Sequence, residues 1–554
     1  MRIDRRRALG LLGAAAPAAG LALAARSSTP AFAYGVASGD PGPESVILWT
    51  RLSGVSADTP VKWTVAEDEG FTRVAADGGA VAVADRDFTI KVEARGLKPG
   101  RSYFYRFSTA QGLSPVGRTR TLPARGSAEP VVLAVASCAL HPNGFFNAYK
   151  AIAELERVDA VVHLGDYIYE YGAEPTAYGM RNGARLGRIP IPAHELVSLT
   201  DYRARHAQYK AEPELQAAHA RAAWIVVVDD HETANNAWLG GAQNHNETEG
   251  EWAARKAAAL RAYFEWMPIR EPRQGAMREA MNRSFRFGDV ASLHMVETRL
   301  LARSEPLDYD TDLPVTDGKP DVAALTRKMQ DPGRRLLGDE QLRDLGHAVR
   351  TSVGEGVTWQ VIGNQVVMAR VAGPDVVKAL GESAVKAALA AAEGRPRQRL
   401  EQMVRLFPHG LPLNLDAWDG YPAERERLYA LFREAKARPI VLAGDSHTAW
   451  VNELHDKDGQ RVAIEFGVTA VSSPPPSYDS IPGVDVKPVI REQNPEVIHM
   501  DTHRGFTLLT LTKEEARAAL VWVSTIESRE FTTRIDKRFR ARPEPAGVSS
   551  VEAL

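Results

Sequence analysis

Residues 160–169 read Ala-Val-Val-His-Leu-Gly-Asp-Tyr-Ile-Tyr, an apolar run that leads straight into side chains able to bind metal ions. Three other apolar runs end in the same way, in Ser-Cys at 137–138, Asp-Asp-His-Glu at 229–232 and Gly-Asp-Ser-His at 444–447. Strand-like runs that alternate with helical stretches predict an α/β domain. In an open α/β sheet, ligands bind beyond the carboxyl ends of the strands. We therefore expect the four ends to meet in one crevice.

The coincidence of these four endings is what favours a metal site. A lone Asp after a strand is usually a turn or helix-cap residue, but here three endings contain Asp and two contain both Asp and His. Asp445 and His447 would point the same way from an extended strand end. The adjacent Asp229 and Asp230 would point to opposite faces of their strand.

The types of side chain indicate which metal and which reaction. Thiolate, phenolate and carboxylate together suit a trivalent ion such as Fe³⁺ better than Mg²⁺. A carboxylate shared by two cations would hold them about 3.5–4 Å apart, where both could polarise one phosphoryl group. Cys138 is the single cysteine, so it cannot form an internal disulfide. It is therefore either a buried, inert thiol or a metal ligand.

The chain divides into four predicted parts. Residues 34–124 contain short β-rich runs, and a turn at 96–100 leads into Tyr103 as in the tyrosine corner of immunoglobulin-like sandwiches. We predict a small β-sandwich there, with a Pro- and Gly-containing boundary loop at 121–130. Residues 130–530 form the predicted catalytic domain, with helices near 211–223, 251–266 and 376–392. Residues 531–554 are charged and predict a peripheral C-terminal tail.

The first 33 residues have the composition of an export signal. Arg5, Arg6 and Arg7 precede an apolar stretch at 8–25, and Ala31 and Ala33 frame a cleavage site. This order resembles a twin-arginine signal, which predicts bacterial export of the folded protein through the twin-arginine machinery. An ordinary Sec signal or a membrane anchor is the alternative. We expect a secreted, periplasmic or cell-wall-associated protein that is not inserted in a membrane after cleavage.

Charge argues against one class of partner. The chain has a net charge of −2, and without residues 1–33 it retains 63 basic and 69 acidic residues, a net charge of −6. Such a balance, with no basic tract, gives no reason to expect nucleic-acid binding. We expect a monomer that acts on small phosphoester substrates.

The motifs resemble those of the alkaline phosphatase D (PhoD) family of metallophosphatases, which are related to purple acid phosphatases. The resemblance runs through most of the chain in family order, at residues 36–41, 48–51, 136–138, 163–172, 229–232, 235–236, 297–299, 418–421 and 444–447. It implies a metallophosphatase-type α/β sandwich preceded by an immunoglobulin- or fibronectin-like β-domain.

The resemblance also implies a set of metal ligands. It assigns Fe³⁺ to four side chains, with Tyr169 giving a phenolate charge-transfer colour: Cys138, Asp166, Tyr169 and His447. Asp166 would bridge to Ca²⁺, whose further ligands would be Asp230 and Asp445. Asp229 and Asn236 would bind a second Ca²⁺ or support the other ligands. His231 would act on the transferring phosphoryl group or the leaving oxygen, or it would only orient Asp230.

The implied reaction is attack of a metal-bound hydroxide on phosphorus in a phosphate ester. The alternative substrates are teichoic-acid or phospholipid-derived diesters, cleaved with the same metals because the His-x-Lys-x₄-Asp motif of phospholipase D is missing after His455. A remote alternative is a non-catalytic cell-surface protein. The family places an arginine after the Gly-Asp-x-x-Tyr stretch, but residues 173–192 depart from its pattern and leave Arg181, Arg185 and Arg188 as equal candidates.

Overall fold

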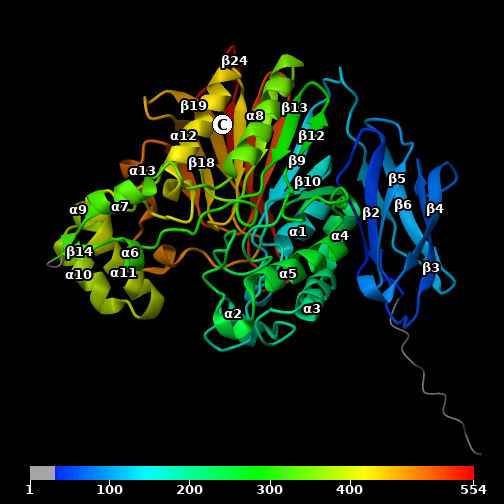
Figure 1. Cartoon of the computed structure of the whole chain (residues 1–554), viewed down its shortest axis with the longest axis horizontal. Coiled ribbons are helices and arrows are strands. Elements are labelled where there is room, and N and C mark those ends of the chain that lie inside the picture. The colour runs from blue at the N-terminus through cyan, green and yellow to red at the C-terminus, as the bar shows by residue number, and fades with distance from the viewer. Residues whose placement is uncertain (1–30, 317–318) are drawn as a thin grey trace, which may run out of the picture.

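The computed structural model describes residues 31–316 and 319–554. Two sheets lie face to face with helices on their outer sides, and a β-domain stands beside them (Figure 1). Residues 1–30 of the predicted export signal lie outside the described residues. Within the described ranges, no helix has the length and apolarity that crossing a membrane requires.

The first sheet has ten strands in the order β26-β23-β22-β21-β9-β10-β11-β1-β2-β5. Three parallel strands form its centre and are buried throughout: β9 (Val131–Ala136), β10 (Ala160–His163) and β11 (Ala223–Val226). Burial on both faces explains why their sequences are continuous apolar runs. The sheet continues on both sides through β21 (Gly505–Leu511), β22 (Ala516–Val523), β23 (Thr533–Ala541), β26 (Glu552–Ala553), β1 (Val36–Gly39), β2 (Ser45–Arg51) and β5 (Thr89–Arg95).

The tail predicted for residues 531–554 requires a correction. β23 pairs with β22 along its whole length, and β26 pairs with β23 at the edge of the sheet. Phe539 and Ala541 are buried in the core, whereas Arg538 and Arg540, which alternate with them, are not. This alternation is the pattern of a half-buried strand, and its charged half made the segment look like a solvated tail.

The second sheet has seven strands in the order β12-β13-β16-β17-β19-β18-β20. Leu293 and Leu442 of this sheet share one hydrophobic core with Leu133 and Ile225 of the first, so the two sheets pack face to face. The strands are β12 (Arg283–Phe287), β13 (Ala291–Met295), β16 (Trp359–Gly363), β17 (Pro439–Ala443), β18 (Ala449–His455), β19 (Arg461–Gly467) and β20 (Val497–Asp501).

Helices cover both sheets and form a lobe at one end (Figure 1). The first sheet packs against α1 (Asn147–Ala153), α3 (Leu199–Lys210), α4 (Pro213–Arg221) and α5 (Trp252–Trp266), and the second against α8 (Gly338–Gly354) and α12 (Pro422–Glu434). The lobe contains α6 (Tyr309–Asp312), α7 (Val322–Met329), α9 (Val376–Leu380), α10 (Glu382–Ala391) and α11 (Gly394–Leu406). The helix predicted near 376–392 is thus two helices, because Gly381 turns the chain with φ +85°. The remaining short elements are α2 (Met180–Leu186), α13 (Lys487–Gln493), β14 (Val315–Thr316), β15 (Lys319–Pro320), β24 (Pro543–Glu544) and β25 (Gly547–Val548).

The N-terminal β-domain shares a sheet with the rest of the molecule. Its second sheet consists of β3 (Thr59–Ala66), β4 (Val74–Ala82), β6 (Ser102–Thr109), β7 (Gly112–Leu113) and β8 (Gly117–Arg120), and it packs on β1, β2 and β5. The predicted tyrosine corner is present, since the hydroxyl of Tyr103 accepts a hydrogen bond from the backbone N–H of Lys98 at 2.8 Å. β1 pairs in parallel with β11, and Gly39 approaches so closely that a Cβ would lie 2.7 Å from the carbonyl oxygen of Trp224.

Candidate metal centre

The four predicted strand ends meet at the carboxyl ends of the central strands, where the two stacked sheets lie face to face. β9, β10 and β11 belong to the first sheet and β17 to the second, so the crevice lies between two sheets and not along a single open one. Three groups of ligand atoms form there, each with all its atoms within 4.8 Å of one another. The groups are Cys138, Asp166 and His447; Asp166, Asp230 and His231; and Asp229, Asp230 and Asp445.

The first group surrounds the phenol of Tyr169. The Tyr169 hydroxyl donates to Asp166 Oδ2 at 3.0 Å and lies 3.3 Å from His447 Nε2. The other ring nitrogen of His447, Nδ1, lies 2.8 Å from the backbone carbonyl oxygen of Pro474. Donation from Nδ1 to that carbonyl leaves the Nε2 lone pair directed at the cluster, which is the tautomer that a metal ligand needs. The structure therefore brings the four predicted iron ligands together.

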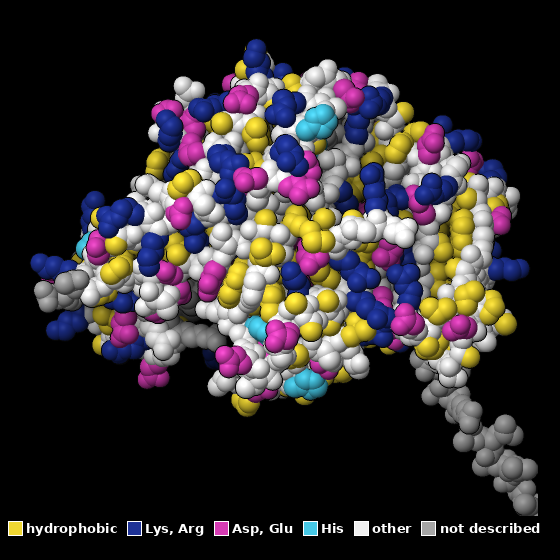
Figure 2. Space-filling view, viewed as in Figure 1, with side chains coloured by type: hydrophobic (Ala, Val, Ile, Leu, Met, Phe, Trp, Pro, Cys, Tyr) yellow, Lys and Arg dark blue, Asp and Glu magenta, His cyan; other side chains and the backbone are white. Residues whose placement is uncertain are grey.

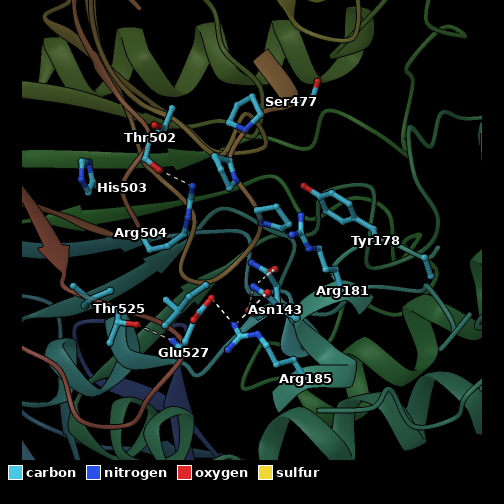
Figure 3. Close-up of a pocket in the computed structure, with 18 of the residues that line it drawn as sticks. Asn143, Tyr178, Arg181, Arg185, Ser477, Thr502, His503, Arg504, Thr525 and Glu527 are labelled. Atoms are coloured by element: carbon cyan, nitrogen blue, oxygen red, sulfur yellow. Dashed lines mark hydrogen bonds and ion pairs between the residues drawn. The ribbon is translucent and has the colours of Figure 1, made fainter. Parts of the chain in front are cut away.

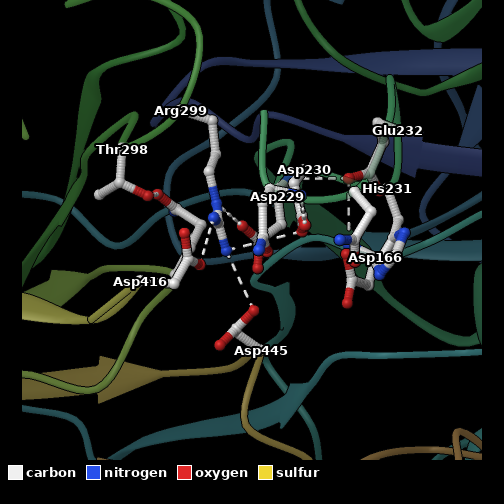
Figure 4. Close-up of polar contacts among 12 residues, drawn as sticks. Asp166, Asp229, Asp230, His231, Glu232, Thr298, Arg299, Asp416 and Asp445 are labelled. Carbon is white, nitrogen blue, oxygen red and sulfur yellow. Dashed lines mark hydrogen bonds and ion pairs between the residues drawn. The ribbon is translucent and has the colours of Figure 1, made fainter. Parts of the chain in front are cut away.

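The second group shares one residue with the first and another with the third (Figure 4). Asp166 belongs to the first and second groups, and Asp230 to the second and third. The three groups thus form a row in which neighbouring positions share one carboxylate. A carboxylate shared in this way is what a bridged pair of metal ions requires.

Several buried ligand atoms have no hydrogen-bond partner among the described residues. Asp166 Oδ1, Asp229 Oδ2 and Asp230 Oδ1 accept no hydrogen bond from any residue that the structure describes. Burial raises the pKa of Asp166 well above its usual value, and the same is true of the Cys138 thiol and the Tyr169 phenol. Buried polar groups are normally paired, and a buried charge needs a counter-charge. Cations in this row would satisfy all of these groups at once, so the residues fit a metal centre.

The backbone at these positions is held in an uncommon conformation. Five of the predicted site residues have positive φ between 51° and 61°: Cys138, Asp166, Asn236, Asp445 and His447. Residues other than glycine rarely adopt this conformation, and where they do it often marks a functional site. Asp445 and His447 are therefore not on an extended strand end, which corrects the argument that we drew from their spacing.

A second argument from spacing is also wrong. Asp229 and Asp230 do not point to opposite faces of a strand, because both lie within 4 Å of the Arg299 guanidinium. β11 ends at Val226, three residues before Asp229, so the strand rule no longer applies there. Asn236 contacts the centre through its backbone, whose N–H donates to Asp230 Oδ2 at 2.6 Å, while its side-chain amide donates to Gln243.

His231 is held by a carboxylate on the side away from the cluster. Its Nδ1 lies 2.7 Å from Glu170 Oε2, which leaves Nε2 as the free ring nitrogen. Burial alone would lower the pKa of the imidazole, but the charges of Asp230, Glu170 and Asp166 outweigh burial and raise it well above its usual value. With Nδ1 held by Glu170, Nε2 is the ring nitrogen that faces the row of carboxylates and could carry a proton for transfer.

Two buried residues without a role in the sequence analysis organise the centre. Glu232 accepts hydrogen bonds from the backbone N–H groups of Asp166, Tyr167 and Asp229, at 3.0, 2.6 and 2.7 Å, and so ties the loops after β10 and β11 together. Arg299 is buried completely and forms ion pairs with four carboxylates, of Asp229, Asp230, Asp416 and Asp445 (Figure 4). Arg299 follows β13 closely, so it was detectable as a fifth strand end with a charged residue.

A cleft of about 1310 Å³ opens beside His447. Tyr178, Arg181 and Arg185 lie in its wall (Figure 3). Tyr178, whose hydroxyl lies 3.1 Å from His447 Nδ1, and Pro474 form part of its wall. The structure also distinguishes the three arginines that the sequence left as equal candidates for the family's arginine. Arg181 and Arg185 line the cleft, with Arg185 in an ion pair with Glu527 at 2.6 Å. Arg188 is buried outside the cleft and pairs with Glu212 at 3.1 Å.

A sandwich of two sheets with clustered Asp, His, Cys and Tyr residues at its strand ends defines a metallophosphatase-type hydrolase. The comparison with known families agrees with this class. A model of PhoD-like phosphatases matches residues 133–520, and a model of the PhoD-like phosphatase N-terminal domain matches residues 14–123. The chain belongs to the PhoD-like phosphatase family and is a phosphoric ester hydrolase.

Individual relatives extend over nearly the whole chain. Alkaline phosphatase D of Bacillus subtilis (strain 168) is 34% identical over 513 residues, which cover 89% of this chain and 77% of the relative. A solved structure of PhoD is 31% identical, covers 95% of this chain and 93% of its own, and superposes with a TM-score of 0.77. A purple acid phosphatase from yellow lupin (Lupinus luteus) seeds is 12% identical with a TM-score of 0.50, over 92% of this chain and 73% of its own, and shares the fold alone. The family argues against the remote alternative of a non-catalytic surface protein.

Proposed function

We propose that this chain is an exported phosphoesterase that depends on one Fe³⁺ and one or two Ca²⁺ ions. The row of three ligand groups joined by Asp166 and Asp230 carries this proposal, together with the unpartnered buried oxygens in it. Thiolate, phenolate, imidazole and carboxylate suit Fe³⁺ in the first group, where Cys138, Asp166, Tyr169 and His447 meet. The oxygen ligands of Asp230 and Asp445, with Asp166 shared, suit Ca²⁺.

We assign Asp229 and Asn236 to supporting positions around a calcium ion. Asp229 is engaged by Arg299, yet its Oδ2 has no partner among the described residues and remains free to bind a cation. Bound in this row, metal ions would supply hydroxide near neutral pH and neutralise the charge on the phosphoryl oxygens.

The chain's own residues have separate tasks in the proposed reaction. His231, oriented by Glu170, donates a proton from Nε2 to the leaving oxygen of the ester or stabilises the transferring phosphoryl group. Glu232 fixes the relative position of Asp166 and Asp229 through their backbone N–H groups. Arg299 keeps Asp229 and Asp445 in place and limits their mutual repulsion. Burial of these groups keeps bulk water out.

The cleft beside His447 favours a second candidate substrate. A phosphate monoester needs room for one organic group, whereas a diester needs room for two. The cleft of about 1310 Å³ leaves space for a large second group, and Arg181 on its wall could contact a further anionic part of such a substrate. Diesters such as those in teichoic acids or derived from phospholipids are therefore the alternative to monoesters, with the same metal centre.

Export through the twin-arginine machinery is part of the proposal. It would carry a folded protein with its metals already bound, which suits a centre assembled from residues as far apart as Cys138 and His447. Amino-terminal sequencing of the secreted protein tests this. Cleavage after Ala33, and retention in the cytoplasm when Arg5 and Arg6 are replaced by Lys, is the expected result.

The test of the metal centre combines composition, colour and turnover. Elemental analysis of the purified protein is expected to find iron and calcium, and chelation to abolish hydrolysis. Tyr169→Phe is expected to remove the visible absorption band, whereas the matched variant Tyr171→Phe, on a ring 6.5 Å away, keeps it. The ratio of rates on paired chromogenic mono- and diesters selects the substrate. A colourless protein without metals that stays inactive after iron and calcium are added would refute the proposal.

A further inference from the structure

A polar groove of about 580 Å³ lies between the N-terminal β-domain and the catalytic domain. One wall consists of the turn before β6 and of strand β8, and the other of residues 156–159 and the end of α4. Five arginines line the groove, Arg101, Arg118, Arg120, Arg157 and Arg221, against three carboxylates, Glu129, Glu156 and Asp159. The groove is thus locally cationic in a chain whose net charge is −2.

The groove is separate from the metal centre. Asp159 directly precedes β10, so the groove lies at the amino ends of the central strands. The metal ligands Asp166 and Cys138 follow the carboxyl ends of β10 and β9. The two sites therefore lie at opposite ends of the central strands of the first sheet. The mechanism proposed for the metal centre does not use the groove.

Two of the five arginines are neutralised within the groove. Arg157 donates to Asp159 Oδ2 at 3.1 Å and to the backbone carbonyl of Pro130 at 2.5 Å. Arg120 donates to Glu129 at 2.9 Å. Asp159 also accepts the backbone N–H of Val132 at 2.8 Å, so its oxygens are fully engaged.

The other three arginines have no carboxylate partner among the residues that the structure describes. Arg101 and Arg118 are exposed. Arg118 and Arg120 are two residues apart on β8, which pairs in regular register with β6, so their side chains share one face of the strand. Arg221 donates only to the backbone carbonyls of Leu155 and Glu156, at 2.7 and 2.9 Å. Burial and the nearby charge of Arg118 lower the pKa of Arg221 by more than the charge of Asp159 raises it.

We propose that this groove binds a linear chain of phosphate groups through Arg101, Arg118 and Arg221. Guanidinium groups bind phosphate oxygens in a two-pronged geometry, and each of the three has donors that no carboxylate occupies. The volume lies within the range of ligand sites and gives room for several consecutive phosphates. A polymeric or oligomeric phosphate compound could therefore be held at this groove. The metal centre, at the other end of the central strands, would stay accessible.

The first experiment measures the reactivity of individual arginines in the intact, metal-loaded protein. Arginines are modified with phenylglyoxal in the presence and absence of inorganic tripolyphosphate, and the modified sites are quantified by peptide mass spectrometry. Tripolyphosphate is expected to slow modification of Arg101 and Arg118 by about ten-fold, as a bound oxyanion occupies their donors. Arg343, which is exposed on α8, is the matched control and keeps its rate. Modification of Arg101 and Arg118 that tripolyphosphate slows no more than it slows modification of Arg343 would overturn the proposal.

A second experiment measures binding. In Arg101→Gln/Arg118→Gln, calorimetry is expected to show the loss of one class of tripolyphosphate site, while hydrolysis of a small chromogenic ester stays within about two-fold of the parent. Arg343→Gln retains both classes. A double variant that binds tripolyphosphate like the parent would overturn the proposal. Orthophosphate at matched ionic strength is expected to protect the arginines poorly, and equal protection would exclude a chain of phosphates as the ligand.

Discussion

At the scale of single residues, the centre depends on which ring nitrogen each histidine presents. His447 and His231 both engage Nδ1, the first with the carbonyl of Pro474 and the second with Glu170. Both therefore direct Nε2 at the carboxylate row, but their surroundings differ. Burial lowers the pKa of His447 to about 3, whereas the carboxylates around His231 raise its pKa. His447 is thus neutral and fit to bind a metal, and His231, held at Nδ1 by Glu170, is placed to donate a proton from Nε2.

Replacement of His231 separates its two suggested roles. His231→Gln removes the proton donor but retains a polar side chain, so we expect kcat to fall by about 10²- to 10⁴-fold. Elemental analysis should find the metal content unchanged, because the cluster keeps Asp166 and Asp230. A parallel loss of metal would show instead that His231 only holds Asp230 in place. Glu170→Gln provides the intermediate case, with the proton donor present but less firmly oriented.

Replacement of Arg299 should affect stability strongly. Arg299→Met leaves four carboxylates without their shared cation, and removal of one partner from a buried ion pair typically costs about 3–5 kcal/mol. We expect a loss of this size in the free energy of unfolding, measured by denaturant titration. Arg334→Met is the matched control, since Arg334 stacks on Tyr421 and contacts only backbone carbonyls. Similar losses in both variants would contradict the role assigned to Arg299.

At the scale of elements, Glu232 fastens two strand-end loops to each other. Glu232→Gln replaces one accepting oxygen with a donor, so at least one of its three backbone N–H partners loses its hydrogen bond. An unsatisfied buried group costs about 1–3 kcal/mol, and the displaced loops should bind metal more weakly. Glu424→Gln is the matched control, because Glu424 binds three backbone N–H groups at the start of α8. Metal loss in Glu232→Gln alone, measured by titration with a chelator, is the expected outcome.

The packing of α3 against the N-terminal β-domain buries an amine that forms no ion pair with any residue the structure describes. Lys210 at the end of α3 lies 4.5 Å from the Trp49 ring and 2.9 Å from His219 Nε2, and burial lowers its pKa well below 10.5. Between the lowered folded pKa and the unfolded pKa, the folded state binds fewer protons than the unfolded state. Stability contributed by this group therefore rises with pH, by up to about 1.4 kcal/mol per pH unit. Lys210→Met should remove that slope in denaturation measured between pH 7 and 10, and a slope that persists would contradict the assignment to Lys210.

The sequence predicted those parts of the fold and site that depend on residues adjacent in the chain. The buried strands β9, β10 and β17 and the proposed ligands after them were visible because an apolar run and the polar side chain that ends it are adjacent in the chain. The partners of Glu232 and Arg299 were not visible, although Arg299 stands after a strand end, since each acts on residues whose proximity arises only when separate strands align. The left-handed backbone at Asp445 and His447 and the membership of β23 in the first sheet likewise depend on tertiary packing.

At the scale of the whole molecule, the two domains of the sequence are one structural unit. β1 lies between β2 of the β-domain and β11 of the catalytic domain, so a single sheet crosses the boundary. Polar contacts reinforce this join. Asp40 pairs with Arg283 at 2.8 Å, and the indole of Trp49 donates to the carbonyl of Glu265 at 2.8 Å. The metal centre follows β11, three residues from its end, and therefore depends on the strand that the β-domain covers.

Removal of the β-domain tests this dependence. In a chain of residues 125–554, β11 becomes an edge strand with unpaired backbone groups, and Trp266 loses Trp49. Exposed apolar edge strands pair with other chains, so we expect aggregation on size-exclusion chromatography and no detectable hydrolysis. A chain ending at residue 550 is the matched control, because it removes β26 from the opposite edge, where β26 pairs only with β23. That chain should remain monodisperse, with activity within about two-fold of the parent, since β26 pairs with only Phe539 and Arg540 of β23, a strand rich in charged residues. A soluble, active 125–554 protein would show that the shared sheet is not required for the centre to form.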